Sequence, residues 1–415
     1  MSEPATTIIE ASQVLTCAGE ETPRRGARMS DVGLIEDGAV ALEGVRVAAV
    51  GPRTDLASRF PDAGRVSLTG HVITPGLIDS HTHAVFGRWR LDEYEMRCAG
   101  VSYMDIARQG GGINASVRDL RDRSEDDLFD LALPRLRKTL AYGTTTVEVK
   151  SGYGLTLEDE LKMLRVVERL SQETWIDVVP TFLGAHAFPP EYRERRDDYV
   201  RLVTEVMIPA VAESGLAVFC DVFVEPGVFT PDEARTILTT ARDHGLTPRL
   251  HADEFESSGG AELAVELGAA SADHLGAISD SGIEALARSD TVATLLPGTL
   301  MFLGHTKYPP ARRILEAGAP VALATDFNPG SSPTVNLRLV MSLACSQMGM
   351  SPAEAMTAVT ANAAGALRLT DGRGSLAVGA PADVAAFAVP DYRMIPYCYG
   401  MNHCAAVWKR GVRVV

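Results

Sequence analysis

Eight short apolar runs, separated by longer amphipathic stretches, constrain the fold of this chain more than any other feature. Runs of this length are typical of strands that are buried on both faces of a parallel sheet. The stretches between them carry helix signals, such as Thr230-Pro231-Asp232, in which Thr230 is expected to cap a helix. Strands that alternate with helices over about 300 residues predict a (β/α)₈ barrel of the TIM type. The eight runs cover residues 72–79, 144–149, 176–183, 217–224, 247–252, 270–275, 292–296 and 321–325.

Shorter β-type runs at both ends of the chain predict a second, smaller domain. Near the N-terminus these runs are broken by Gly, Pro and charged turns, which favours a small antiparallel sheet. The same pattern returns after about residue 370. We therefore expect an α/β protein in which residues 71–370 form the barrel, while residues 1–70 and 371–415 together form a small β-sandwich domain.

Charge excludes some classes of partner. The chain has 39 basic and 54 acidic residues, a net charge of −15, which disfavours nucleic-acid binding because phosphates require clustered Lys and Arg. An anionic substrate would need a local cationic pocket. No run of about 18 apolar residues predicts a membrane span, and residues 1–21 lack the pattern of a secretion signal. These features predict a cytoplasmic protein that binds neither nucleic acid nor membrane.

Polar residues stand at the ends of four of the eight runs. His81 and His83 follow the first run, His251 ends the fifth, His274 lies in the sixth and Asp326 follows the eighth. Active sites of such barrels lie at the carboxyl ends of the strands. Residues two apart in a strand face the same side, so His81 and His83 can reach one ion. The pattern therefore predicts a metal site at this end of the barrel.

The residue types indicate which metal and which chemistry to expect. Three imidazoles and one carboxylate suit zinc or ferrous iron better than calcium or magnesium, which prefer oxygen ligands. One coordination position is expected to remain for water. Such an ion lowers the pKa of its water and polarises a carbonyl oxygen, which is the chemistry of hydrolysis.

These residues resemble the amidohydrolase superfamily, and longer blocks narrow the resemblance to the imidazolonepropionase family of histidine degradation. The blocks extend from about residue 70 to residue 335, and the flanking sheet is similar in character. They are HTHAVFGRWR at 81–90, GGGI at 110–113, KSGYGL at 150–155, LGAHA at 183–187, HADE at 251–254, SADHL at 271–275, LPGT at 296–299 and ATDFNPGSS at 324–332.

The resemblance implies hydrolysis of 4-imidazolone-5-propanoate to N-formimidoyl-L-glutamate, with one zinc or iron ion per chain. It implies that His81, His83, His251 and Asp326 are the ligands. His274 would orient the nucleophile or stabilise developing charge, and Glu254 would move a proton between water and the leaving nitrogen. Which of Glu254, His274 and Asp326 accepts the first proton stays open. The resemblance also implies a homodimer.

The substrate of that family is anionic, and Arg90 is the cation expected to hold its propanoate, because a guanidinium group binds a carboxylate through two hydrogen bonds. Tyr153 and His186, on the loops after the second and third runs, resemble the remaining substrate contacts of the family. Beyond Asp326, amide and hydroxyl donors are available for a carboxylate of the product. These donors belong to Asn328, Gly330 and Ser331.

Two other functions remain possible from the sequence. The first is a different mononuclear cyclic amidohydrolase or a deaminase, and the second is a non-catalytic scaffold with the same barrel. A two-metal member usually has a carboxylated Lys at the end of the fourth strand, where this chain has Glu225, although Lys150 could in principle bridge two ions. Cys398 stands where many relatives would have His, and we expect it to affect packing in the terminal sheet and not activity.

Overall fold

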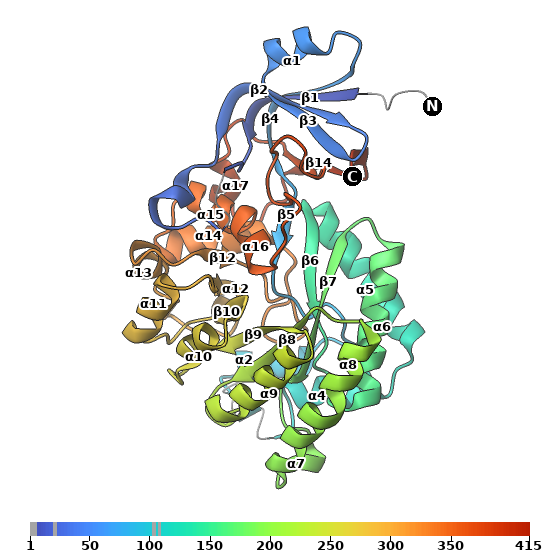
Figure 1. Cartoon of the computed structure of the whole chain (residues 1–415), viewed down its shortest axis with the longest axis vertical. Helices are drawn as coiled ribbons and strands as arrows, with labels where there is room; N and C mark the ends of the chain where they lie inside the picture. The colour runs from blue at the N-terminus through green and yellow to red at the C-terminus, as the bar shows by residue number, and fades with distance from the viewer. Residues whose placement is uncertain (1–5, 20–22, 102–104, 107–108) are drawn as a thin grey trace.

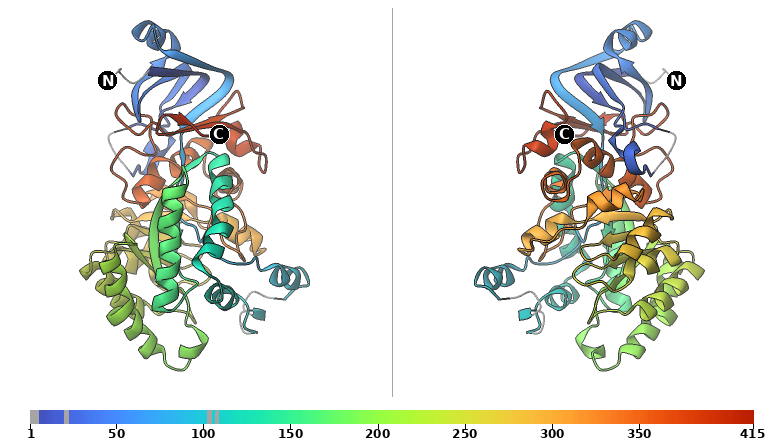
Figure 2. Two further views of the ribbon diagram at one scale, coloured as in Figure 1. Left: turned by 90° about the vertical axis from the view of Figure 1, so that its right-hand side faces the viewer. Right: turned by 90° about the vertical axis from the view of Figure 1, so that its left-hand side faces the viewer.

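The computed structural model describes residues 6–19, 23–101, 105–106 and 109–415, and these form two parts (Figure 1). A sheet that contains strands from both ends of the chain lies at one end of the molecule. The barrel forms the rest, and its strands are surrounded by helices in both side views of Figure 2. None of the helices in the described part of the chain is long and apolar enough to cross a membrane.

The barrel contains the eight predicted strands. They pair in parallel from β5 to β12 in chain order, and each apolar run of the sequence overlaps one of them, so the predicted barrel is confirmed. The strands are β5 (Leu77–Asp79), β6 (Thr144–Lys150), β7 (Asp177–Ala185), β8 (Phe219–Val224), β9 (Thr247–Ala252), β10 (Ser271–His274), β11 (Val292–Leu295) and β12 (Val321–Leu323).

Two barrel helices begin at threonine caps, and the cap that the sequence predicts at Thr230 is confirmed. The side chain of Thr156 accepts a hydrogen bond from the first turn of α6, and Thr230 and Glu233 form a capping box at the start of α9. The helices are α1 (Arg53–Arg59), α2 (Leu91–Cys98), α4 (Ile113–Arg121), α5 (Glu125–Ala141), α6 (Leu157–Glu173), α7 (Arg196–Arg201), α8 (Ile208–Ser214), α9 (Pro231–Asp243), α10 (Gly260–Glu266), α11 (Asp280–Ala287), α12 (Pro297–Phe302), α13 (Ala311–Glu316), α14 (Leu337–Met348), α15 (Pro352–Ala358), α16 (Ala361–Ala366) and α17 (Met394–Tyr397), with shorter turns η1 (Gly26–Ser30), η2 (Pro190–Tyr192) and η3 (Leu202–Met207).

Strands from both ends of the chain form one seven-stranded sheet, and the contribution of both ends is as expected. Its order is β15-β14-β13-β4-β1-β2-β3, and one apolar cluster contains residues from both ends of this order, including Val40 and Trp408. The prediction of a purely antiparallel sheet is wrong, because β1 pairs with β4 in parallel. The strands are β1 (Thr6–Leu15), β2 (Leu34–Glu43), β3 (Arg46–Pro52), β4 (Gly64–Pro75), β13 (Val384–Phe387), β14 (Cys404–Lys409) and β15 (Val412–Arg413).

Two local expectations need correction. The first apolar run, 72–79, is shared between the two sheets, because β4 pairs with β13 up to Pro75 and β5 begins at Leu77. Between them a Cβ atom on Gly76 would lie 2.1 Å from Oγ1 of Thr145, so a residue without a side chain is required there. Cys398 follows α17 and lies between two strands of the small sheet, not within a strand. The domain boundaries at residues 70 and 370 stay a prediction.

The barrel closes where its first and last strands meet. The carboxylate of Asp79 accepts hydrogen bonds from the backbone N–H and the hydroxyl group of Thr325, at 3.0 and 2.6 Å. Just beyond, Thr82 forms a parallel bridge with Phe327, and the N–H of Asp326 donates to the carbonyl of His81. This seam brings two segments that carry predicted site residues side by side.

Candidate active site

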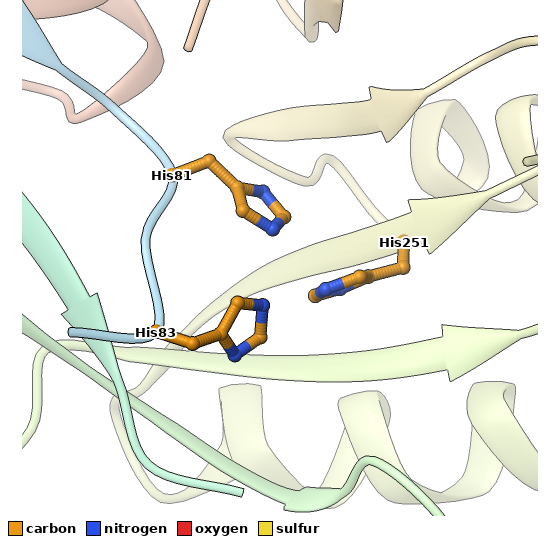
Figure 3. Close-up of side chains that lie close together, drawn as sticks. All are labelled: His81, His83 and His251. Atoms are coloured by element: carbon orange, nitrogen blue, oxygen red, sulfur yellow. The ribbon is translucent and has the colours of Figure 1, made fainter. Parts of the chain in front are cut away.

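Three histidines from opposite sides of the barrel converge at the carboxyl ends of the strands (Figure 3). His81 and His83 follow β5, and His251 lies in β9. The ring centroid of His81 lies 4.5 Å from that of His251 and 5.4 Å from that of His83. One nitrogen of each ring lies within 4.8 Å of the others, so the three imidazoles can bind one ion.

His274 and Asp326 complete the cluster. One ligand atom each from His81, His274 and Asp326 lie within 4.8 Å of one another, and Oδ1 of Asp326 is 3.4 Å from Nε2 of His83. His274 and Asp326 have φ values of +79° and +52°, in the left-handed region that residues with a Cβ atom rarely adopt. The structure therefore brings together all five residues that the strand ends predicted, two of them with strained backbone.

The donor atoms fit a metal ion. Nδ1 of His81 lies 2.7 Å from Oδ2 of Asp273, and Nδ1 of His251 lies 3.1 Å from Oδ1 of Asp221. A carboxylate at Nδ1 holds the proton there and leaves the Nε2 lone pair free to bind metal. Among the described residues, neither Nε2 atom has a hydrogen-bond partner, although both rings are buried. Buried polar atoms without partners are rare, and an ion would satisfy these two.

Electrostatics favours neutral imidazoles in this cluster. Burial, together with Lys150 and the neighbouring imidazoles, holds the pKa of His81 well below its usual range. Burial and the nearby His251 do the same to the pKa of His83, and burial lowers the pKa of His274 to about 3. A neutral imidazole is the form that binds metal, so the lowered pKa values of these three histidines favour metal binding.

Lys150 lies beneath the histidines and is fully buried. Its Nζ atom is 2.8 Å from Oε1 of Glu148 and 2.8 Å from Oδ2 of Asp221. Burial opposes the ionisation of Asp221, but His251 and Lys150 outweigh it and hold the pKa of Asp221 well below its usual range. The ammonium group is thus engaged by two carboxylates, which does not favour the alternative in which Lys150 bridges two metal ions.

Glu254 lies on the loop after β9 and is 8% exposed. Its Oε1 atom is 3.5 Å from Nδ1 of His274. Burial, with the charges of Asp326 and Glu225, raises the pKa of Glu254 well above its usual range. A carboxyl group with a raised pKa can both hold and release a proton near neutral pH.

Glu225, at the end of the fourth barrel strand, holds the loop that carries Glu254. Its carboxylate accepts hydrogen bonds from the backbone N–H groups of Glu254, Phe255 and Glu256, at 3.1, 3.2 and 2.7 Å. In the sequence, Glu225 was considered only because it stands where two-metal members of the superfamily have a carboxylated lysine. Its position at a strand end was the available signal for a role in the site.

Arg90 lies on the segment after His83, and the two residues line one cavity. Its side chain is 6% exposed, and its Nε and Nη1 atoms have no hydrogen-bond partner within the described part of the chain. Its Nε atom lies 3.7 Å from Oε2 of Glu93. A Cβ atom on Gly330 would lie 1.7 Å from Nη2 of Arg90, so glycine at 330 makes room for the guanidinium group.

Tyr153 and His186 lie beside the histidine cluster. The ring of His186 stacks on that of His83, with centroids 5.0 Å apart, and its Nδ1 atom contacts the carbonyl of Gly152. The ring centroid of Tyr153 is 5.9 Å from that of His83. Behind them, the buried carboxylate of Glu160 accepts hydrogen bonds from the backbone of the loop that carries Tyr153. Glu160 was not identified from the sequence.

Asn328 differs from its expected arrangement, because its side chain is used within its own loop. Both of its amide hydrogens have acceptors, the carbonyl of Asp326 at 2.7 Å and Oγ of Ser331 at 2.9 Å. Its Oδ1 atom accepts from the N–H groups of Gly330 and Ser331. In this conformation Asn328 fixes the loop after Asp326 and offers no free N–H to a carboxylate.

All of the predicted site residues except His81 and Gly330 line one small cavity of about 40 Å³. This volume holds a few water molecules, so binding of an organic substrate requires the surrounding loops or side chains to move. Ten predicted residues line the cavity, namely His83, Arg90, Tyr153, His186, His251, Glu254, His274, Asp326, Asn328 and Ser331. Sequence reasoning missed the apolar residues Ile113, Phe223, Phe255 and Leu303, which carry no chemical signal in a sequence.

Comparison with known proteins agrees with this geometry. The model of the amidohydrolase family matches residues 72–414, and a model of the imidazolonepropionase-like composite domain of bacteria matches residues 38–63. The chain is 52% identical to an imidazolonepropionase of Geobacillus kaustophilus (strain HTA426) over 413 residues, which cover 98% of this chain and 97% of that protein. Imidazolonepropionases of Brevibacillus brevis and Alkaliphilus metalliredigens are 49% and 46% identical, with the same coverage of both chains.

Solved structures of more distant sequence share the fold. An adenosine deaminase from Xanthomonas campestris with bound zinc matches with a TM-score of 0.73 and 18% identity, over 99% of this chain and 93% of that one. A triazine hydrolase variant matches with a TM-score of 0.75 and 17% identity, over 99% and 94%. These two likenesses concern the fold alone, whereas the sequence matches concern the family. The chain therefore belongs to the amidohydrolase family and, within it, to the imidazolonepropionases.

Proposed function

We propose that this chain hydrolyses 4-imidazolone-5-propanoate to N-formimidoyl-L-glutamate in histidine degradation. The observation that carries the proposal is that one cavity is lined by His83, His251 and Asp326 and also by Arg90, whose side chain is buried. The histidines and Asp326 suit the reacting amide, and the guanidinium group suits a carboxylate. The identity of 46–52% to imidazolonepropionases over 98% of the chain supports this substrate.

We assign one zinc or iron ion to His81, His83, His251 and Asp326. The unpartnered Nε2 atoms of His81 and His251 and the lowered pKa values of His81 and His83 support this set. When bound, such an ion lowers the pKa of a water molecule and polarises the carbonyl oxygen of the substrate.

Glu254 and His274 are assigned to the proton transfers. Water adds to the ring carbonyl carbon, the C–N bond breaks, and one proton must pass from the water to the leaving nitrogen. The carboxylate of Glu254 takes up this proton and delivers it, since its raised pKa suits both steps. His274, 3.5 Å from Glu254, orients the water or stabilises the negative charge that develops on the oxygen. Asp326 is the other group able to accept the first proton.

Arg90 is assigned to the propanoate, with which its two unpartnered nitrogen atoms can form hydrogen bonds. Tyr153 and His186 are assigned to the imidazolone ring, next to which their own rings would lie. Gly330 and Ser331 are assigned to the carboxylate that forms on hydrolysis, which would take the place of Oδ1 of Asn328 as the acceptor of their N–H groups. Asn328 is assigned to the loop that carries them. A cytoplasmic homodimer remains part of the proposal, on the strength of the family resemblance, and analytical ultracentrifugation tests the dimer.

The test is an ultraviolet assay for loss of imidazolonepropanoate and formation of formimidoylglutamate, run beside hydantoin, dihydroorotate and guanine. We expect turnover of the first compound only. Turnover of another compound instead would assign a different cyclic amidohydrolase or deaminase reaction. His251→Ala is expected to abolish turnover, and unchanged turnover would favour a non-catalytic role for the histidine cluster. Metal analysis is expected to give one ion per chain, and two tightly bound ions would overturn the mononuclear site.

A further inference from the structure

Lys150 has no role in the proposed chemistry, although it is one of the largest fully buried side chains of the protein. It ends β6, and its ammonium group forms ion pairs of 2.8 Å with Glu148 of the same strand and with Asp221 of β8. All three side chains have no exposed area. A buried charge is costly unless it is paired, so these groups depend on one another.

Through Asp221, the ammonium group acts on His251. Oδ1 of Asp221 lies 3.1 Å from Nδ1 of His251 and also accepts the backbone N–H of that residue at 3.2 Å. Oδ2 of the same carboxylate faces Lys150. If the ammonium group were absent, Oδ2 would lose its cation and the carboxylate would rotate or move toward other donors. The imidazole of His251 would then lose the contact that orients it.

Through Glu148, the same ammonium group acts on the segment between the other two histidines. Oε2 of Glu148 accepts the backbone N–H of Thr82 at 3.1 Å, and the hydroxyl group of Thr82 donates to the carbonyl of Glu148 at 2.6 Å. The backbone N–H of Lys150 donates to the carbonyl of Thr82 at 2.9 Å. Thr82 lies between His81 and His83, so Lys150 connects both histidine-bearing segments.

A second buried cation has an equivalent arrangement at His81. Nη2 of Arg249 is 3.0 Å from Oδ2 of Asp273, and this oxygen lies 2.7 Å from Nδ1 of His81. Arg249 and Asp273 also have no exposed area. The carboxylates at Nδ1 of His81 and of His251 are therefore each paired with a buried cation. Lys150 differs from Arg249 because it reaches two carboxylates and, through them, two strands.

We propose that Lys150 is a positioning residue of the metal site, whose ammonium group, through Asp221 and Glu148, holds His251 and the His81–Thr82–His83 segment in the arrangement that binds the ion. The inference rests on the proposed function in that these histidines are the assigned ligands. In this arrangement Lys150 does not bind the ion itself and acts on it only through Asp221 and Glu148.

The experiment compares the metal affinity of purified full-length variants by competition with a zinc chelator. Lys150→Met keeps much of the side-chain volume and removes the charge, and we expect zinc affinity to fall about 10- to 100-fold. Lys409→Met is the matched control, because Lys409 is also buried between two carboxylates, at 2.6 Å from Asp177 and 2.5 Å from Asp383, but in the small sheet. The control is expected to lose stability and to keep wild-type zinc affinity.

Asp221→Asn gives a second, independent measurement if Lys150→Met does not fold. This variant keeps an oxygen near His251 but has no charge to pair with Lys150, and we expect its zinc affinity to fall as well. The fold-loss of zinc affinity in the double variant should be smaller than the product of the two single fold-losses, because both changes act through one carboxylate. Wild-type zinc affinity in Lys150→Met or in Asp221→Asn, or fully multiplicative losses, would overturn the inference. Absence of zinc binding by the wild-type chain would instead overturn the proposed function.

Discussion

The hydroxyl group of Thr299 donates a hydrogen bond of 2.6 Å to Oδ2 of Asp326, and Oδ1 of the same carboxylate faces His81 and His83. Thr299 lies in the first turn of α12, and Asp326 follows β12. The hydrogen bond therefore fixes which carboxylate oxygen is presented to the imidazoles. It connects the loop after the seventh barrel strand to a proposed metal ligand on the eighth.

Replacing Thr299 by Val is expected to lower kcat for imidazolonepropanoate about ten-fold or more. Val has nearly the same shape but no hydroxyl group, and a hydrogen bond to a charged group contributes about 1.5–3 kcal/mol. Steady-state kinetics would measure the change. The matched control is Thr291→Val, which removes a buried hydroxyl group that donates to the carbonyl of Ala269. Equal kcat values for the two variants would contradict a role of Thr299 in the site.

Glu254→Gln is expected to lower kcat by about 10²- to 10⁴-fold with a smaller change in KM, because Gln cannot transfer a proton. The raised pKa of Glu254 means that its carboxyl group keeps its proton to a higher pH than an exposed glutamate does. Wild-type kcat should therefore rise as the pH increases through this raised pKa, and the variant should lack this rise. Glu256→Gln, two residues along and exposed, serves as the control. A pH–rate profile that is the same in Glu254→Gln and wild type would assign the proton transfer to another group.

Arg90→Ala is expected mainly to raise KM, because the guanidinium group would bind the propanoate equally in the ground state and in the transition state. Arg88→Ala provides the control, since Arg88 lies two residues earlier and its side chain is 72% exposed. We expect the control to change KM little. If Arg90→Ala left both KM and kcat unaltered, Arg90 would not hold the propanoate.

Gly330→Ala tests the same contact from its other side. The added Cβ atom would lie 1.7 Å from Nη2 of Arg90 and must displace the guanidinium group. KM should therefore rise although every charged group is retained. Combining Gly330→Ala with Arg90→Ala should raise KM little beyond Arg90→Ala alone, and additive effects would show that the two residues act separately.

Glu225 predicts a pH dependence of stability. Burial raises the pKa of Glu225 to about 7, whereas its usual value is 4.5. Between these values the folded chain keeps a proton that the unfolded chain has lost, so the contribution to stability is complete below the unfolded pKa and is lost as the pH rises through about 7. Glu225→Gln has no such group. Urea unfolding at about pH 5 and about pH 8 should show a larger loss of unfolding free energy in the wild type than in the variant, and parallel losses would contradict the prediction.

The barrel and the histidine cluster could be predicted because each depends on a local pattern. Every barrel strand is a short apolar run, and each run that carries a site residue carries it at the carboxyl end. The geometry of a parallel barrel then brings these ends together without further information. His81, His251 and Asp326 were identified in this way although they are far apart in the sequence.

The residues that support the cluster could not be predicted because their roles depend on register between strands. Asp221 lies within an apolar run, and only the pairing of β8 with β9 puts it beside His251. Glu160 lies on a helix and would be taken for a solvated first-turn acid, yet it is buried beneath the loop that carries Tyr153. The division of the first run at Gly76 could not be predicted either, because the side chain that requires glycine there is that of Thr145, which belongs to another strand.

The seam between β5 and β12 has a consequence for how the site matures. His81 and Asp326 flank this seam, so the proposed ion would join the first strand of the barrel to the last. A nascent chain on the ribosome has no complete set of ligands until the segment that follows the eighth strand has emerged. With the proposed ligands, metal uptake is expected late in biogenesis, because a chain truncated before Asp326 would retain three histidines and lack the carboxylate that completes the set.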